Sequence, residues 1–329
     1  MSRGFVDYIR RFGDKSFDEF KFREADMLVL TQLSYTKLNG IVSDNFTETM
    51  SMKDAVGAYI SQEHHKMKQN VLDFLEAIVQ SRRFGDAKMC GAWYGNKRYG
   101  EPLQFAAVTI KPFDGLNIIT YRGTDGTAHG WKEDFLFSCR DQTLAQKSAL
   151  IYLESASEKL DGSIMVSGHS KGGNLAAYAA IFAKSFIQDR IIRVYCNDGP
   201  GFNEIQNVFS TEGYMNIKNK IVCIMPQQSI VGQIMQCFPS INNYIIHSNN
   251  SGVMQHDMFS WEISENGALN WHRPQCIDSL FKNLMILLNK KIFSTSLKER
   301  ERIAALIWDN IGSDSEDKIN EYYSSFKEE

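Results

Sequence analysis

Residues 168–173, Gly-His-Ser-Lys-Gly-Gly, constrain the fold more than any other part of this chain. A short apolar run at residues 164–166 precedes them and is typical of a strand, while the alanine-rich residues 174–186 predict a helix. Glycines on both sides of Ser170 permit a turn tight enough to hold the serine in a strained backbone conformation. The pattern predicts a strand, a sharp turn and a helix, with Ser170 as candidate nucleophile. The alternative is a serine that only caps the helix.

Composition is that of an ordinary globular chain of 329 residues, 43% hydrophobic and 23% charged. Lysine and arginine total 36 against 39 for aspartate and glutamate, so the net charge of −3 gives no general affinity for nucleic acid or another polyanion. The six cysteines are scattered without C-x-x-C spacing, which favours reduced core residues over disulfides or a zinc site. We therefore expect no metal and no nucleotide cofactor.

Two segments bear on targeting. Residues 1–23 lack the apolar run that a secretory signal needs. The most apolar later stretch, residues 284–293, contains Asn289, Lys290 and Lys291 and is far shorter than the roughly 20 residues that span a bilayer. We expect a cytoplasmic protein without an integral membrane segment.

Strand and helix patterns alternate along the chain. Apolar spacing predicts helices over residues 25–34 and 52–80. The later elements are, in order, a hairpin at 105–111 and 116–121, a helix at 144–160, and strands at 191–196, 221–225 and 244–248, followed by two or three helices. This order predicts a mostly parallel sheet with helices on both faces and a ligand crevice at the carboxyl ends of the strands. We expect a single domain over 1–329, with a mainly helical part (1–90), a catalytic core (91–272) and C-terminal helices (273–329).

A serine nucleophile needs a histidine base, and the base needs a carboxylate to fix its tautomer. Where the chain order is serine, acid, histidine, the candidates after Ser170 are His247, His256 and His272. His256 lies just beyond the last predicted strand, in a loop that can return to the serine, so it is the predicted base. His247 sits within an apolar strand, His272 lies beside Trp271, and a loop histidine bonded to backbone is the alternative for His256.

The acid is chosen from two strand ends. The strand after the serine helix ends in Asn-Asp-Gly-Pro-Gly, residues 197–201, and offers Asp198. The following strand ends in Pro-Gln-Gln-Ser, residues 226–229, and offers no carboxylate. We predict Asp198 as the acid, with an Asx-turn in the Gly-Pro-Gly bend as its alternative role. Asp257 is the reserve candidate, although its position next to His256 makes side-chain pairing awkward.

Charge that develops on the substrate oxygen needs two fixed hydrogen-bond donors. One is the backbone amide of Lys171, directly after the nucleophile. Thr124 is predicted to supply the other, because it follows Gly123 at the end of a strand. We expect the Lys171 side chain at the mouth of the site.

Several segments carry a resemblance. Residues 121–124, Tyr-Arg-Gly-Thr, followed by Gly-Trp-Lys-Glu-Asp at 130–134, resemble the oxyanion region of the class 3, fungal-type triacylglycerol lipases. Together with residues 198–202, 226–232 and 254–261, they are more similar still to an uncharacterised bacterial family of lipase-like α/β-hydrolases, the Mbeg1-like proteins. The resemblance covers about residues 25–262. It implies an α/β-hydrolase fold, here with helical N-terminal and C-terminal additions, and catalytic roles for Ser170 and His256. In class 3 lipases the acid follows the strand that ends at residues 226–229, where this chain has glutamines.

These patterns predict a serine hydrolase that cleaves a carboxylic ester of lipase or esterase type, with a small-molecule or lipid ester as substrate. Two alternatives stay open: a catalytically weak or inactive lipase-like binding module, suggested by the missing acid, and an acyltransferase that uses the same serine. Either of the loops 202–219 and 227–242 can serve as a lid. Because neither has a long apolar face, we expect a modest preference for lipid interfaces.

Overall fold

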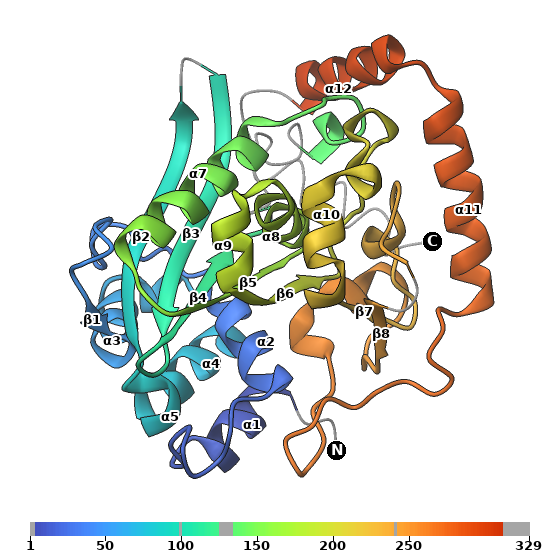
Figure 1. Cartoon of the computed structure of the whole chain (residues 1–329). Helices are drawn as coiled ribbons and strands as arrows, with labels where there is room; N and C mark the ends of the chain where they lie inside the picture. The colour runs from blue at the N-terminus through green and yellow to red at the C-terminus, as the bar shows by residue number, and fades with distance from the viewer. Residues whose placement is uncertain (1–3, 99–100, 125–133, 240–241, 312–329) are drawn as a thin grey trace.

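A twisted sheet forms the centre of the molecule (Figure 1). The structure is a computed structural model that describes residues 4–98, 101–124, 134–239 and 242–311. Eight strands of the described part pair in sequence order: β1 (Met50–Ser51), β2 (Lys88–Arg98), β3 (Glu101–Lys111), β4 (Leu116–Tyr121), β5 (Ser163–His169), β6 (Ile191–Asn197), β7 (Ile221–Pro226) and β8 (Asn243–Ile246). Strands β1 to β4 are antiparallel, and β4 to β8 are parallel.

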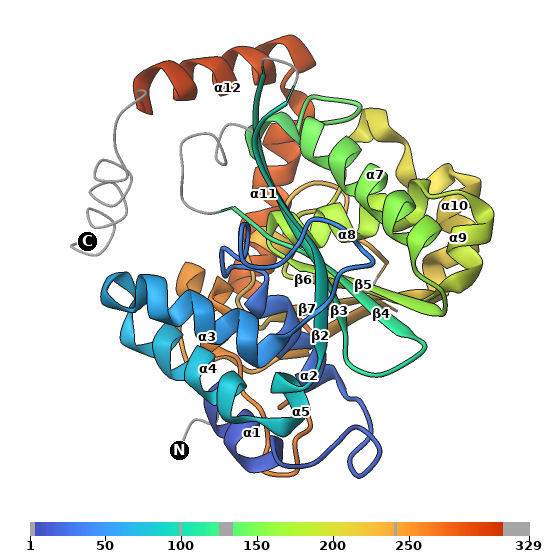
Figure 2. The same ribbon diagram turned by 90° about the vertical axis from the view of Figure 1, so that its left-hand side faces the viewer.

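Helices cover both faces of the sheet, as Figure 2 shows. Parallel strands that follow each other in one direction, joined by right-handed crossovers, send every crossover helix to the same face. That face carries α7 (Leu144–Lys159), α8 (Lys171–Phe182), α9 (Ser185–Arg190) and α10 (Glu212–Ile217). The opposite face is covered by α1 (Phe5–Phe12), α2 (Glu24–Leu33), α3 (Met52–Glu63), α4 (Gln69–Gln80) and α5 (Arg82–Gly85). The predicted α/β class is confirmed, and the N-terminal helices are what complete its second face.

Each face has its own apolar core. Leu153 of α7, Leu175 of α8 and Val194 of β6 belong to the core under the crossover helices. On the other face, Leu30 of α2 packs in a core that also contains Trp261, from the segment after β8. The fully buried indole of Trp261 donates a hydrogen bond to the carbonyl of Gln255 at 2.8 Å. The chain that follows β8 is thereby fixed to the body of the protein, next to His256.

Most predicted elements are confirmed, and three of the differences are informative. Residues 52–80 form two helices instead of one, because the polar residues around a short 3-10 turn, His64–Lys66, supply no apolar face. The helix expected to reach residue 186 ends at Phe182. Strand β2 was not predicted, since two register shifts and the positive φ of Gly91 interrupt the alternation that marks a strand. All six cysteines are free, as expected, but Cys276 is exposed and not a core residue.

Up to residue 311, where the described part ends, two helices follow the sheet, α11 (Ser279–Ser294) and α12 (Leu297–Ile311), and the sequence predicts two or three. Helix α11 stands at the side of the molecule, beyond the β7–β8 edge of the sheet (Figure 1). None of the helices in the described part combines the length and apolar composition that a membrane crossing requires.

Candidate active site

Ser170 occupies the turn between β5 and α8 with φ 57° and ψ −131°, a backbone conformation that costs an L-residue free energy. Close packing enforces it. A Cβ on Gly168 would lie 2.0 Å from the carbonyl oxygen of Gly172, and a Cβ on Gly172 would lie 2.2 Å from that of Tyr121. The Ser170 amide donates to the carbonyl of Asn197, 3.0 Å away. The two glycines therefore allow the helix to start directly against neighbouring strands, which is the geometry predicted from the sequence.

Asp198 and His256 lie together. Asp198 directly follows β6, is fully buried and has a positive φ of 45°. Its Oδ2 lies 2.6 Å from His256 Nδ1. Its Oδ1 accepts hydrogen bonds from Ser229 Oγ at 2.5 Å and from the Gly232 amide at 3.1 Å. Because an ionised carboxylate only accepts hydrogen bonds, Nδ1 of His256 carries the hydrogen, and in the neutral ring Nε2 is left as the basic nitrogen.

His169, the residue before the serine, lies against His256 with ring centres 4.5 Å apart. Its Nε2 is 2.8 Å from the carbonyl oxygen of His256, which can only accept, so Nε2 carries the hydrogen. The hydroxyl of Tyr35 therefore donates to Nδ1, 2.8 Å away. Burial, and after it the charge of the neighbouring His256, lower the pKa of His169 well below its usual value. A neutral imidazole thus links the turn at Ser170 to the backbone of His256.

The glutamines at the end of β7 support the loop of His256. This loop is a 3-10 turn, Gly252–His256. The side-chain oxygen of Gln228 accepts a hydrogen bond from the Gly252 backbone amide at 2.6 Å. The backbone amide of Gln228 donates to Gln255 Oε1 at 2.8 Å. Gln227 accepts from the amide of Ser248 at 3.0 Å. The glutamines after β7 thus position the histidine loop, and the carboxylate that contacts His256, that of Asp198, follows β6.

The end of β4 packs against the turn at Ser170. A Cβ on Gly123 would lie 2.6 Å from the carbonyl oxygen of His169 and 3.1 Å from the Cβ of Ser170. Thr124 follows it, and its hydroxyl donates to Asp134 Oδ2 at 2.6 Å. That bond leaves the backbone amide as the group that Thr124 can offer a ligand. Residues 130–133, which carry part of the resemblance to lipases, lie outside the described residues.

The side chain of Lys171 is buried, so the prediction that it lies at the mouth is wrong. It is 1% exposed and donates to the carbonyl oxygen of Gln104 at 2.9 Å and to the side-chain oxygen of the same residue. Gln104 in turn donates to the carbonyl of Gly123 at 3.2 Å. Lys171 begins α8, which packs on β4, and its long side chain reaches Gln104 of β3, so it supports the Gly123 turn through that residue.

The remaining candidates lie elsewhere. His247 and His272 pack edge to face, with ring centres 4.7 Å apart. Asp257 is exposed, and its Oδ1 accepts from the Phe259 amide at 3.0 Å, where it caps the next 3-10 turn, Met258–Ser260. No hydrogen bond joins Ser170 to His256 within the part of the chain that the structure describes.

A sheet that is parallel from β4 to β8, with a strained serine between glycines at a strand-to-helix turn, is the arrangement of the α/β-hydrolase fold. The chain belongs to the Mbeg1-like family, whose model matches residues 78–309. Among solved structures, M37 lipase is 18% identical over 63% of this chain and 68% of the lipase chain, with a TM-score of 0.36. Lipase II from Rhizopus niveus is 13% identical over 75% of this chain and 88% of its own, with a TM-score of 0.38. No curated protein matches the sequence.

Proposed function

We propose that this protein is a serine hydrolase that cleaves carboxylic esters through an acyl-enzyme on Ser170. The observation that carries the proposal is the hydrogen bond between Asp198 and His256, formed directly beside the strained turn that presents Ser170. His256 serves as the base, Asp198 as the acid, and the backbone amides of Thr124 and Lys171 as the oxyanion donors.

In this mechanism Nε2 of His256 takes the proton of Ser170 Oγ while the oxygen attacks the ester carbonyl. The tetrahedral intermediate collapses, and the protonated His256 gives its proton to the leaving alcohol. Water then attacks the acyl-enzyme with His256 again as base, which releases the acid and restores the serine. Asp198 stabilises the imidazolium in both steps through the bond to Nδ1.

The first step requires a hydrogen bond between Ser170 and His256 that the described contacts do not include. Such bonds are often long or absent without substrate and form in the complex. His169 bonds to the backbone of His256, so the two reacting residues are tied to each other through one intervening imidazole. The mechanism requires the Ser170–His256 bond to form when the substrate binds.

The same contacts favour an enzyme over a binding module. A buried carboxylate that accepts from Ser229, Gly232 and His256 is costly to retain unless it has a task. The binding module is suggested only by the glutamines after β7, where an acid is missing. Asp198, which follows the neighbouring strand β6, supplies a carboxylate to His256. A lipid or other small-molecule ester as substrate and a cytoplasmic location stay predictions of the sequence.

The proposal is tested with a fluorophosphonate probe, which labels only activated serines. We expect the wild type to be labelled and to hydrolyse short-chain nitrophenyl esters, and Ser170→Ala to lose both. Ser61→Ala is the matched control, because Ser61 is an exposed helix serine that bonds only to the carbonyl of Gly57. Equal labelling of wild type and Ser170→Ala, or an unreactive wild type, would refute the proposal.

A further inference from the structure

Helix α11 exposes an apolar stripe. Leu280 is 73% exposed, Leu287 66% and Leu284 51%, and Leu288 lies beside them. Positions 280, 284, 287 and 288 follow the i, i+4, i+7, i+8 spacing of one helix face. Single exposed leucines are common on proteins, but a continuous row of them marks a surface that another phase or molecule covers.

The opposite side of α11 is well fixed. Met285 is buried, and Asn289 accepts from the Met235 amide and donates to the Gln233 carbonyl, both at 2.7 Å. At the start of the helix, Gln228 donates to Asp278 at 3.0 Å. The outward row of leucines is therefore presented by an anchored helix and does not belong to a loose tail.

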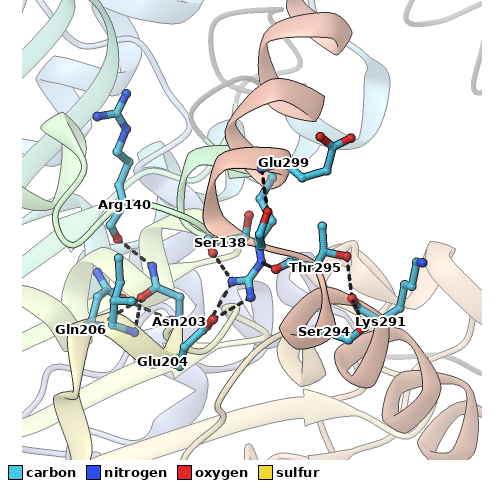
Figure 3. A network of polar contacts seen from close by, with 12 residues as sticks. Ser138, Arg140, Asn203, Glu204, Gln206, Lys291, Ser294, Thr295 and Glu299 are labelled. Carbon is cyan, nitrogen blue, oxygen red and sulfur yellow. Dashed lines mark hydrogen bonds and ion pairs between the residues drawn. The ribbon is translucent and has the colours of Figure 1, made fainter.

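Helix α12 anchors the other end. Arg300, only 6% exposed, donates to both carboxylate oxygens of Glu204, at 2.6 and 3.1 Å. The same guanidinium donates to the carbonyl oxygens of Ser138 and Thr295 (Figure 3). Since Thr295 directly follows α11, this network fixes the C-terminal end of the helix on the body of the protein.

The charge of α11 is opposite to that of the whole chain. The helix carries Lys282, Lys290 and Lys291 and no acidic residue, whereas the chain has a net charge of −3. All three lysines are exposed. Lys291, seven positions after Leu284, extends the leucine face, and Lys290 precedes it, whereas Lys282, seven positions before Asn289, lies on the anchored side. A leucine face that ends in lysines suits the interface of an anionic bilayer, where leucines enter the acyl region and ammonium groups meet lipid phosphates.

We propose that α11 docks this protein on an anionic lipid surface, with the helix lying in the plane of the interface. The helix has 16 residues, too short to cross a bilayer but long enough to lie on one. A second copy of the chain that pairs through this face with the two helices parallel is a poorer occupant, because it would bring Lys290 and Lys291 of both helices together. The inference does not depend on ester hydrolysis. The modest interfacial preference predicted above considered only the loops 202–219 and 227–242, and this face lies outside both.

Cosedimentation with vesicles tests the proposal on the full-length protein. Wild type is expected to bind vesicles of equimolar phosphatidylcholine and phosphatidylglycerol, and to bind phosphatidylcholine alone more weakly. Leu284→Ser with Leu287→Ser should lower the partition coefficient by roughly tenfold or more, since two leucines no longer enter the apolar layer. Lys290→Glu with Lys291→Glu should weaken binding at low salt and reduce its salt dependence. Phe186→Ser, a change at a 55% exposed site on α9, is the matched control and should bind as wild type.

Folding of each variant is checked by its thermal unfolding midpoint, and light scattering without lipid gives its oligomeric state. The proposal is overturned if wild type does not bind the mixed vesicles, or if the double leucine variant binds them equally well. It is also overturned if wild type is a dimer that the leucine substitutions convert to a monomer while lipid binding is unchanged. In that case the apolar row serves self-association.

Discussion

His256 Nδ1 and Asp198 Oδ2 are 2.6 Å apart, although 58 positions separate the two residues in the sequence. The carboxylate next to His256 in sequence, Asp257, instead caps a 3-10 turn on the exposed side of the same loop. Asp257 is therefore close to His256 along the chain, but only the buried Asp198 contacts the imidazole ring. This contrast gives a direct test of the proposed acid.

Asp198→Asn should lower kcat for a nitrophenyl ester roughly a thousandfold or more, because an amide no longer stabilises the imidazolium and can hold the wrong tautomer of His256. Asp257→Asn is the same chemical change at the carboxylate next to His256 in sequence, and should keep activity near that of the wild type. The measurement is kcat and KM for both variants, with thermal unfolding to confirm folding. Comparable losses in the two variants would count against Asp198 as the acid.

The sequence predicts the turn at Ser170 well, because its requirements are local. Gly168 and Gly172 are each needed where a Cβ would meet a carbonyl oxygen, and such needs are visible as glycines at fixed spacing. The sequence also indicates Asp198, as a carboxylate at a strand end, and the structure shows its contact with His256. The contacts of Asp198 with Ser229 and Gly232 are not indicated, since they depend on how the loop after β7 folds back.

Other contacts left no local signal. Tyr35 reaches His169 across 134 positions, and neither residue type in isolation indicates a structural role. The burial of Lys171 depends on Gln104 of β3, so the expectation that a charged residue next to the proposed nucleophile lies at the surface is wrong. In the sequence, the glutamines after β7 indicate only that an acid is missing there. Their hydrogen bonds to the loop 252–256 depend on the fold.

His169 should make stability depend on pH. Its pKa is lowered in the folded state mainly by burial, so below an unfolded pKa of about 6.5 the unfolded chain binds a proton that the folded protein does not. Its effect on the free energy of unfolding is therefore constant above about pH 6.5. As the pH falls below that value, stability decreases by up to ~1.4 kcal/mol per pH unit.

Urea unfolding of wild type and His169→Gln between about pH 5 and pH 8 measures this contribution. Glutamine keeps a donor for the His256 carbonyl and an acceptor for Tyr35 but does not titrate in this range. We expect the difference in unfolding free energy between the two proteins to change with pH only on the acid side. Parallel curves for the two proteins would show that the protonation of His169 does not change when the protein unfolds.

Gln228→Ala should slow ester hydrolysis by roughly tenfold, since the Gly252 amide loses its acceptor and the loop that carries His256 is less well positioned. The same side chain also donates to Asp278 at the start of α11. Asp278→Ala removes that second bond alone and is the matched control, with little change in kcat expected. If Asp278→Ala slows the reaction as much as Gln228→Ala does, the effect runs through α11 and not through the histidine loop.

Gly172→Ala should destabilise the protein by about 1–3 kcal/mol or more, because the new methyl group would lie 2.2 Å from the carbonyl oxygen of Tyr121. Backbone cannot move aside as a flexible side chain can, so α8 has to shift from β4. Gly57→Ala in α3 is the control: its Cβ meets nothing within 4 Å, and alanine should stabilise that helix by about 0.5–1 kcal/mol. Urea unfolding gives both values.

Since the shift of α8 also moves Ser170, folded Gly172→Ala should react more slowly with a fluorophosphonate. Wild-type stability with wild-type reactivity would mean that helix and strand can separate without disturbing the turn, contrary to the close packing that enforces its strain.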